Sequence, residues 1–212
     1  MKTIIQIISI VGVVLGRLVE IICFGSKGQY LIYVFRRALA TGRYSSRFRS
    51  IGKGIKLAPG MKLGNANHIS LGNNVSVMSH CVLECTGYLA EMVLGDNISI
   101  GEYSHITCAQ KMLIGDGLLT GRYVLITDNA HGENLPNELN IPPLARRVYS
   151  SGPVIIGRNV WIGDKVTIMA NVRIGDGCII GANSVVTHDI PNYSIAVGAP
   201  AKVIKTIDKK DK

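Results

Sequence analysis

The stretch that decides the fold is IIGRNVWIGDKVTIMANVRIGDGCIIGANSVV, residues 155–186. Within it a branched apolar side chain returns every six residues, at Ile156, Ile162, Ile168, Ile174, Ile180 and Val186. Glycine follows four of these positions, and a valine or a small residue stands four positions after each of the first five. A period of six matches neither the 3.6-residue period of an α-helix nor the two-residue alternation of a long strand. The stretch therefore predicts a repeating structural unit.

The same spacing recurs upstream in three shorter runs, Leu71–Val77–Leu83, Leu94–Ile100–Ile106 and Ile114–Thr120–Ile126. A six-residue unit fits one side of a triangular coil, with a short strand on the side and a turn at the corner. Three units make a coil of about 18 residues, and stacked coils bury a core that no single coil could bury alone. We therefore predict an all-β fold, a parallel β-helix of hexapeptide repeats over residues 49–206.

The repeat also gives a register and shows where it breaks. Ile106 and Ile126 are 20 residues apart, one coil plus two, whereas Ile126 and Ile156 are 30 apart, one repeat plus an insertion of 24. Ile106, Ile126, Ile168 and Val186 should therefore stack on one side. The insertion, a proline-rich loop at about 132–155, should leave the coil just after His131. Loops that are held by a rigid scaffold often carry the functional groups.

His131 is the candidate catalytic residue in ITDNAHGEN, residues 126–134. An imidazole accepts a proton near neutral pH, so it can serve as a general base. The alternative is an ordinary histidine of a surface loop. Asp128 or Glu133 could fix the tautomer of His131, or both could simply be solvated. Asn129 could bind a substrate hydroxyl, and His105, one coil earlier on the same side, could line the same pocket.

The basic residues are concentrated at the N-terminus. Residues 1–60 hold ten lysines and arginines and one acid, and the whole chain has a net charge of +9. Residues 1–48 are apolar and basic and predict helices. These helices could lie on an anionic membrane surface, or they could pack on the main domain or across an oligomer. The basic residues lack the interleaved aromatic residues of a nucleic-acid module, which argues against nucleic acid as a partner.

The five cysteines do not have the spacing of metal ligands, so we expect small core residues in a reducing compartment and no bound metal. Residues 207–212 form a charged C-terminal tail. We expect a cytoplasmic protein, and the membrane alternative for residues 1–48 would place it at the inner face of the cytoplasmic membrane.

About residues 51–206 resemble the hexapeptide-repeat acyltransferases. The ending GANSVVTHDIPNYSIAVGAPAKVIK, residues 181–205, is similar to the usual end of that family. The galactoside, maltose and polysaccharide O-acetyltransferases are the most similar members, and PPLARRVYSSGPVIIGRNVWIG, residues 142–163, resembles the polysaccharide and lipopolysaccharide enzymes. The resemblance implies a left-handed β-helix, a homotrimer with active sites between neighbouring β-helices, and acetyl-CoA as donor.

The resemblance also implies roles for individual residues. His131 matches the family's catalytic base, which precedes such a loop. Trp161 resembles the tryptophan beside the acetyl-CoA cleft, although simple packing is an equally good interpretation. The other positions that match donor contacts are Asp164, Ala182, Thr187, His188, Lys202 and Lys205. Tyr103 stands near the acceptor-binding asparagine of the galactoside enzymes, and this departure argues against a galactoside as the substrate.

The leading hypothesis is an acetyl-CoA-dependent O-acetyltransferase that acts on a sugar hydroxyl in cell-surface polysaccharide or lipopolysaccharide biosynthesis. One alternative is an N-acetyltransferase of an amino sugar or of another small acceptor. Another is a β-helix that serves as a non-catalytic scaffold. The family also includes γ-type carbonic anhydrases, but the five histidines lack the close spacing on adjacent coils that a shared metal requires.

Overall fold

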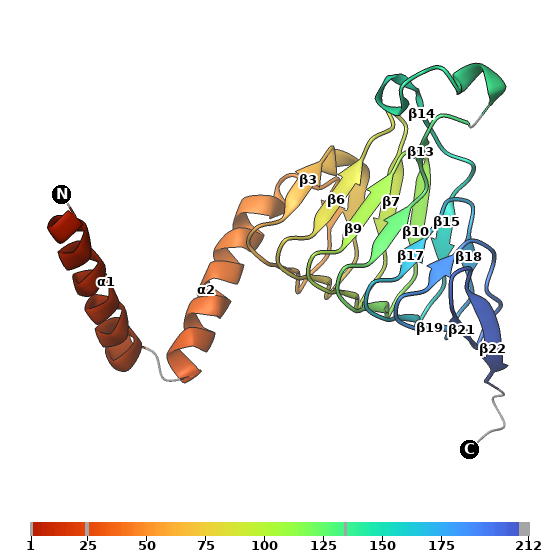
Figure 1. Ribbon diagram of the computed structural model, residues 1–212. Coiled ribbons are helices and arrows are strands. Elements are labelled where there is room, and N and C mark those ends of the chain that lie inside the picture. Colours follow the sequence, from red (N-terminus) through yellow and green to blue (C-terminus); the bar gives the residue numbers. More distant parts are fainter. Residues whose placement is uncertain (1, 24–25, 134, 208–212) are drawn as a thin grey trace.

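The computed structural model describes residues 2–23, 26–133 and 135–207. Two helices come first in the described chain, α1 (Lys2–Cys23) and α2 (Ser26–Ser45), and a stack of short strands follows. Figure 1 shows α1 standing apart from the strands, whereas α2 runs up to the first coil. The predicted parallel β-helix is confirmed, because the strands pair from coil to coil in three sheets that are parallel apart from the last strand.

Each coil contributes one strand to each sheet. The first sheet contains β1 (Ser50–Ile51), β4 (Ile69–Leu71), β7 (Glu91–Leu94), β10 (Lys111–Ile114), β15 (Val154–Ile156) and β18 (Arg173–Ile174). The second contains β2 (Lys56–Leu57), β5 (Ser76–Val77), β8 (Ser99–Ile100), β11 (Leu119–Thr120), β16 (Trp161–Ile162), β19 (Ile179–Ile180), β21 (Ser194–Val197) and β22 (Lys202–Thr206). The third contains β3 (Lys62–Gly64), β6 (Val82–Cys85), β9 (His105–Cys108), β12 (Leu125–Thr127), β17 (Thr167–Ile168) and β20 (Val185–Val186).

The register predicted from the repeat is confirmed in the third sheet. Ile126 pairs with Ile106 on one side and with Ile168 on the other, and Ile168 pairs with Val186. All four side chains are fully buried. The residues that precede them in each strand are only half-buried, so the inward column forms the core of the stack. The six-residue period is therefore the spacing between one inward side chain and the next.

Aspartate side chains tie one coil to the next where the first sheet turns into the second. The Oδ1 atom of Asp176 accepts a hydrogen bond from the backbone N–H of Arg158 at 2.7 Å, and Asp96 accepts one from Asn73 in the same way at 2.7 Å. Gly157 lies directly against this carboxylate, since a Cβ atom there would come within 2.5 Å of Asp176 Oδ1. The Ile-Gly-Asp pattern thus supplies an inward side chain, room for the next coil and a link between coils.

The second half of α2 covers the open face of the first coil. Ala40 and Tyr44 are buried on one side of the helix, and Phe48 continues the same four-residue spacing just beyond the helix end. The Tyr44 hydroxyl donates to the Met61 carbonyl at 3.2 Å, and the Leu57 N–H donates to the Thr41 hydroxyl at 2.8 Å. This part of the N-terminal segment packs on the main domain.

The first half of α2 and the described side chains of α1 leave large apolar residues exposed, among them Ile8, Val13, Leu31 and Phe35. Within the residues that the structure describes, no helix combines the length and the apolar character that crossing a membrane would need. The last strand, β22, ends at Thr206. Most of the expected charged tail, residues 208–212, lies outside the described residues.

The long excursion leaves the third sheet earlier than the sequence predicted. β12 ends at Thr127, the next two-residue strand β13 (Ala130–His131) pairs antiparallel with β14 (Val148–Tyr149), and the first sheet resumes at Val154 with β15. His131 therefore lies in a hairpin at the base of the loop, not on the coil itself as expected. Figure 1 shows this hairpin and the loop projecting from one edge of the stack.

Candidate functional site

His131 is held in place by the backbone on both sides. It pairs with Val148 across the hairpin, and the N–H of Gly132 donates to the Arg147 carbonyl at 2.9 Å. Gly132 has a φ of +91°, a conformation that side chains disfavour, and a Cβ atom there would meet Glu138 and Arg146 at under 3 Å. The imidazole is exposed, and no described side chain forms a hydrogen bond with it. It is thus available to a substrate.

The loop beyond His131 is ordered by its own side chains. The Glu138 carboxylate accepts hydrogen bonds from the N–H groups of Glu133 and Leu135, at 2.8 and 3.2 Å. The Arg146 guanidinium donates through Nε to the Ile141 carbonyl at 2.8 Å. Two short 3-10 turns, Pro136–Glu138 and Pro143–Ala145, begin at prolines. Glu133 itself is exposed and makes only a backbone contact here, so its suggested hydrogen bond to His131 is not formed in this arrangement.

Asp128 corrects an expectation drawn from the sequence. Its side chain is completely buried, and its carboxylate accepts hydrogen bonds from the N–H groups of Ala109, Gln110 and Lys111 at 2.6, 2.8 and 3.0 Å. The carboxylate therefore stabilises the turn of the preceding coil. It neither holds the imidazole of His131 nor faces a substrate, because its oxygens are enclosed by the chain's own donors.

Asn129 and the neighbouring thiols belong to the same buried corner. The Asn129 amide donates to the Thr107 hydroxyl at 3.2 Å and to Asp128 at 3.3 Å, which leaves the half-buried side chain engaged with its own chain. Cys85 and Cys108 are register partners in β6 and β9. The hydrogen bond with Cys85, burial and the Asp128 carboxylate all raise the pKa of the Cys108 thiol, which therefore stays protonated.

A cleft of about 510 Å³ adjoins the hairpin that carries His131. We call it the loop-base cleft; it is lined by Thr86, Gly87, Tyr88, Leu89, Ala109, Gln110, Arg147, Val148, Tyr149 and Ser150. Val148, the cross-strand partner of His131, lies on the same face of the hairpin as the imidazole. Tyr88 is 92% exposed, and Arg147 is the only charged residue in the lining. The cleft offers an aromatic surface and one cation beside the candidate base.

Sequence reasoning did not identify the residues of this cleft. Arg147 lies within the recognised motif PPLARRVYSSGPV, but nothing in the motif says which of its residues meets the coil. Gln110 is joined to Ser150 by a side-chain hydrogen bond of 3.2 Å, and the two residues are 40 positions apart in the chain. The sequence held one signal for this cleft, the two consecutive apolar residues Tyr88 and Leu89 between two repeats. The structure shows that both are exposed, in a corner longer than its neighbours.

His105 and Tyr103 lie one coil before the loop. His105 Nε2 is 2.8 Å from Glu84 Oε1, on the outer face of the third sheet. Tyr103 stacks between His80 and Tyr123, with ring centroids 5.0 and 5.1 Å apart. These three rings stand where the second sheet turns into the third, which we call the second corner. Tyr103 is 47% exposed, so its ring edge faces solvent as a binding residue would.

The residues expected to contact the donor lie along two parts of the stack. Trp161, 53% exposed, stands on the outer face of the second sheet between Leu119 and Ile179. Asp164 and Ala182 follow at the second corner, where Asp164 accepts a hydrogen bond from the Arg122 N–H at 2.8 Å. The remaining candidates are exposed and lie after β20 or in β22: Thr187, His188, Lys202 and Lys205.

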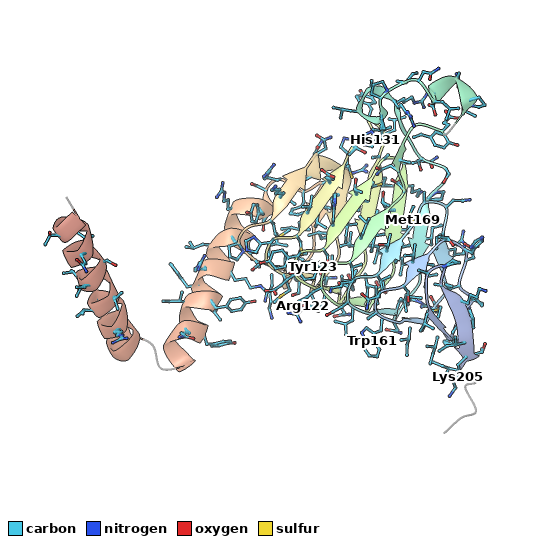
Figure 2. All side chains as sticks on the ribbon, in the orientation of Figure 1. Arg122, Tyr123, His131, Trp161, Met169 and Lys205 are labelled. Atoms are coloured by element: carbon cyan, nitrogen blue, oxygen red, sulfur yellow. The ribbon has the colours of Figure 1, made fainter. Side chains whose placement is uncertain are left out.

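One chain does not bring Trp161 and Asp164 together with His131. The hairpin of His131 leaves the stack where the third sheet turns into the first, the third corner, whereas Trp161 and Asp164 belong to the second sheet and the second corner. Figure 2 shows His131 and Trp161 on opposite sides of the stack. Among the described residues, no group of three His, Cys, Asp or Glu side chains is arranged to hold a metal ion.

Three comparisons with known proteins agree on the kind of protein. Residues 153–188 match the family model of the bacterial transferase hexapeptide (six repeats). WbbJ of Escherichia coli K12, named as an O-acetyl transferase of lipopolysaccharide biosynthesis, is 35% identical over 152 residues, which are 70% of this chain and 76% of WbbJ. The dTDP-4-amino-4,6-dideoxy-D-glucose acyltransferase of Escherichia coli is 31% identical over 166 residues, 77% of this chain and 84% of that enzyme.

A solved structure extends the likeness to three dimensions. AntD, an N-acyltransferase from Bacillus cereus, was crystallised as a variant with dTDP-4-amino-4,6-dideoxyglucose and coenzyme A. It matches with a TM-score of 0.66 and 26% identity, over 77% of this chain and 86% of AntD. The similarity thus covers the β-helix in both sequence and shape.

Proposed function

This chain belongs to the bacterial hexapeptide-repeat acyltransferases, and from that premise we propose that it transfers an acetyl group from acetyl-CoA to a sugar hydroxyl, with His131 as general base. Its relatives are acetyltransferases and acyltransferases, and a similar structure holds coenzyme A. The acceptor we propose is a cell-surface polysaccharide or lipopolysaccharide precursor, because WbbJ is named for lipopolysaccharide biosynthesis.

The observation that carries this proposal is the position of His131 beside the loop-base cleft. The imidazole is exposed and has no hydrogen-bond partner among the described side chains, and its backbone is fixed by the pairing with Val148. A general base needs both a free ring nitrogen and a fixed position, because a small misplacement weakens proton transfer severely. The cleft supplies an aromatic wall at Tyr88 and Tyr149 for a sugar ring.

The mechanism follows from this placement. His131 accepts the proton of the acceptor hydroxyl as the oxygen attacks the acetyl carbonyl of the thioester. A backbone N–H that lines the cleft would stabilise the oxyanion that develops. The coenzyme A thiolate then leaves with the proton returned from the imidazole. The chain supplies no nucleophile in this scheme, which suits Cys81, Cys85, Cys108 and Cys178, since all four are buried.

We propose that the donor is held by the exposed candidates of the second sheet and the chain end. Trp161 would pack on the pantetheine arm, with Asp164 and Ala182 as neighbours, and Lys202 and Lys205 would meet the nucleotide phosphates. Thr187 and His188 would contribute from the third corner. All these residues are exposed, and both lysines lie on β22.

The separation of Trp161 and Asp164 from His131 supports an active site shared between chains of a homotrimer. A second chain can present its second corner to the hairpin of the first, which a single chain cannot do for itself. In this arrangement Tyr103 would reach the acceptor from the second corner of the neighbouring chain, and His105 from the third sheet of its own chain. The proposed trimer thus explains why the candidate residues lie at two different corners.

An N-acyltransferase acting on an amino sugar is the second candidate. It is favoured by the names of two similar proteins, the dTDP-4-amino-4,6-dideoxy-D-glucose acyltransferase and AntD. The cleft would serve either acceptor, because both are sugars and differ in the attacking atom. Arg147, the only cation of the lining, would meet a phosphate or carboxylate on either one.

We further propose that the enzyme works in the cytoplasm at the inner face of the membrane, with peripheral contact through residues 1–48. The support is the basic charge of this segment and its exposed apolar side chains. A precursor attached to lipid would present its sugar there.

The experiment that tests the function follows free coenzyme A released by the purified chain from acetyl-CoA and a panel of sugars and nucleotide sugars. His131→Ala should lower kcat by roughly 10²–10⁴-fold, the usual contribution of a general base. Asp116→Asn, at an exposed corner between the first and second sheets, is the control and should keep its rate.

The product decides between the two acceptors. An ester is released by mild base and an amide is not, so mass analysis before and after base treatment separates O- from N-acetylation. A His131→Ala rate equal to that of the control would contradict the proposed base. A chain that neither binds acetyl-CoA nor releases coenzyme A with any acceptor would instead favour the scaffold alternative.

A further inference from the structure

One side of α2 carries an apolar stripe that faces away from the β-helix. Leu31, Phe35 and Leu39 are 66%, 63% and 59% exposed, and their four-residue spacing places them on one side of the helix. Leu31 and Ala40 are nine residues apart and so lie on opposite sides, at about 100° per residue. Because Ala40 packs on the first coil, the stripe is turned away from it.

The flanks of the stripe are cationic. Arg36 and Arg43 are exposed beside it. Residues 21–83 contain nine lysines and arginines and no aspartate or glutamate. The whole region around the stripe therefore attracts anions, and nothing in its sequence neutralises it. Exposed apolar residues bordered by cations are typical of helices that lie in the headgroup region of a membrane.

A cavity of about 430 Å³ opens on the other flank, between α2 and the first coil. It is lined by Tyr30, Tyr33, Val34, Arg37, Ala38, Thr41, Ile55 and Lys56. Arg37 donates to the Ser76 hydroxyl at 2.7 Å and to the Lys56 carbonyl at 3.1 Å. Its Nε atom is the only buried side-chain nitrogen or oxygen of the described residues without a hydrogen-bond partner. The cavity is thus lined by two cations and no carboxylate.

We propose that α2 docks on an anionic lipid bilayer. The stripe of Leu31, Phe35 and Leu39 enters the boundary of the acyl chains, while Arg36 and Arg43 meet headgroup phosphates on one flank. On the other flank a headgroup phosphate enters the cavity of Arg37 and Lys56. Arginine and lysine side chains can reach the headgroup phosphates because their long alkyl chains stay in contact with apolar groups.

Charge selects a lipid surface over a second copy of this chain. Two copies that met through this stripe would bring together two regions without a single carboxylate, and the arginines would repel each other. An anionic bilayer is complementary to both the apolar stripe and its cationic flanks. This inference rests on the proposed function only for the suggestion that the acceptor is at the membrane, and its test does not depend on acyl transfer.

The test is flotation of the purified full-length chain with two kinds of vesicle, phosphatidylcholine alone and phosphatidylcholine mixed with phosphatidylglycerol. We expect binding to the mixed vesicles to be roughly ten-fold stronger and to weaken as salt is raised. Phe35→Glu should weaken binding to the mixed vesicles several-fold, because it places a charge in the stripe. Leu144→Glu is the matched control, because it places the same charge on a leucine that is 90% exposed in the long loop.

Two further variants separate the flanks. The double change Arg36→Gln and Arg43→Gln should weaken binding to mixed vesicles, and Lys56→Gln tests the cavity in the same assay. Circular dichroism and the thermal midpoint show that each variant is folded. Equal binding of the wild type to both vesicles, or equal binding of Phe35→Glu and Leu144→Glu, would overturn the proposal.

Light scattering without lipid tests the rival occupant. If the stripe joins copies of the chain, Phe35→Glu will lower the mass of the assembly, and the wild type will not bind vesicles. If our proposal is right, the mass will be unchanged. Transfer to a soluble acceptor is measured in parallel. A Phe35→Glu chain that loses vesicle binding but keeps this activity supports docking of α2 on a lipid surface. Loss of activity in the His131 variant tests only the proposed general base.

Discussion

His131 and Asp128 are three residues apart and have opposite surroundings. The imidazole of His131 is exposed and is positioned through the main chain of a two-stranded hairpin. The carboxylate of Asp128 is buried and accepts three backbone N–H groups of the preceding coil. Asp128 therefore fixes the point at which the chain leaves the stack, and the hairpin transmits this position to His131.

We predict that Asp128→Asn lowers both stability and kcat. The amide would turn an N–H donor toward at least one backbone N–H, and a buried donor without an acceptor costs about 1–3 kcal/mol. The shift of the loop exit should lower kcat more than it raises the KM for acetyl-CoA. Thermal unfolding and steady-state kinetics measure the two effects.

Asp116→Asn is the matched control for that variant. Asp116 accepts one hydrogen bond, from the Asp96 N–H at 2.8 Å, at an exposed corner where the remaining carbonyl oxygen of asparagine suffices. Its midpoint and kcat should stay near those of the wild type. If the two asparagine variants behave alike, Asp128 does not position the loop.

A pH-dependent part of the stability is predicted at Asp176. The N–H of Arg158, followed by its guanidinium, lowers the pKa of this carboxyl. A lowered pKa in the folded state stabilises the protein above the unfolded pKa, which is about 3.9, and this contribution is lost as the pH falls through the folded pKa. Asp176→Asn should therefore unfold at lower urea than the wild type at pH 7, and the gap should close in acid.

Arg158→Gln completes this experiment as a double-mutant cycle. It should remove the part of the gap that comes from the guanidinium, since its Nη2 lies 3.0 Å from Asp176 Oδ2. The double variant should lose less than the sum of the two single variants. A gap between wild type and Asp176→Asn that is constant from pH 7 to 3 would exclude the charge as its source.

At the scale of elements, β12 joins the core to the site. Ile126 is fully buried between Ile106 and Ile168, so Ile126→Ala should lower the free energy of unfolding by about 2–5 kcal/mol. Leu125→Ala, on the outer face of the same strand, should cost clearly less because its side chain is only half-buried. Urea denaturation measures both. Equal costs would mean that the inward and outward positions are misassigned.

The coils could be predicted from the sequence because a single requirement repeats in them. Each unit needs one inward apolar side chain and one tight corner, and both requirements recur in the sequence every six residues. The exit of the loop left no such period. Its hairpin has two residues per strand, and Asp128 looked like a polar loop residue although it is buried. Burial of a carboxylate depends on donors from another coil, which a linear pattern does not reveal.

The candidate site was predicted unevenly for the same reason. His131 could be proposed from the sequence because imidazole chemistry and a break in the repeat coincide, and its role stays a prediction. The cleft beside it was not, since Gln110 and Arg147 meet only after the loop has folded back on the coil. In α2, the four-residue spacing of Ala40, Tyr44 and Phe48 was legible in the sequence, but the segment was so apolar throughout that this face did not stand out.

At the scale of the whole molecule, the proposed trimer makes a prediction about mixed assemblies. If His131 of one chain works with Trp161 of its neighbour, His131→Ala and Trp161→Arg chains should complement each other when co-expressed. Each mixed trimer would contain one interface where both native residues meet. Activity should therefore reappear in tag-purified mixed trimers although each homotrimer is inactive.

The outcome differs sharply if each chain holds a complete site. Every site would then carry one of the two defects, and mixed trimers would be as inactive as the parents. A chain with both substitutions, mixed with wild type, is the control for subunit exchange. Recovery of coenzyme A release in the first mixture, at equal protein, would support the shared site.

Both ends of the β-helix are covered, and this limits how the number of coils can change. A parallel β-helix is open at both ends and could in principle join others end to end into a filament. Here α2 covers the first coil, and β22 closes the last by pairing antiparallel with β21. The stack can therefore change length from within, by whole coils. A coil added between β15 and β20 would move the loop and the chain end apart by one coil's thickness, whereas a coil added before β12 would leave their separation unchanged.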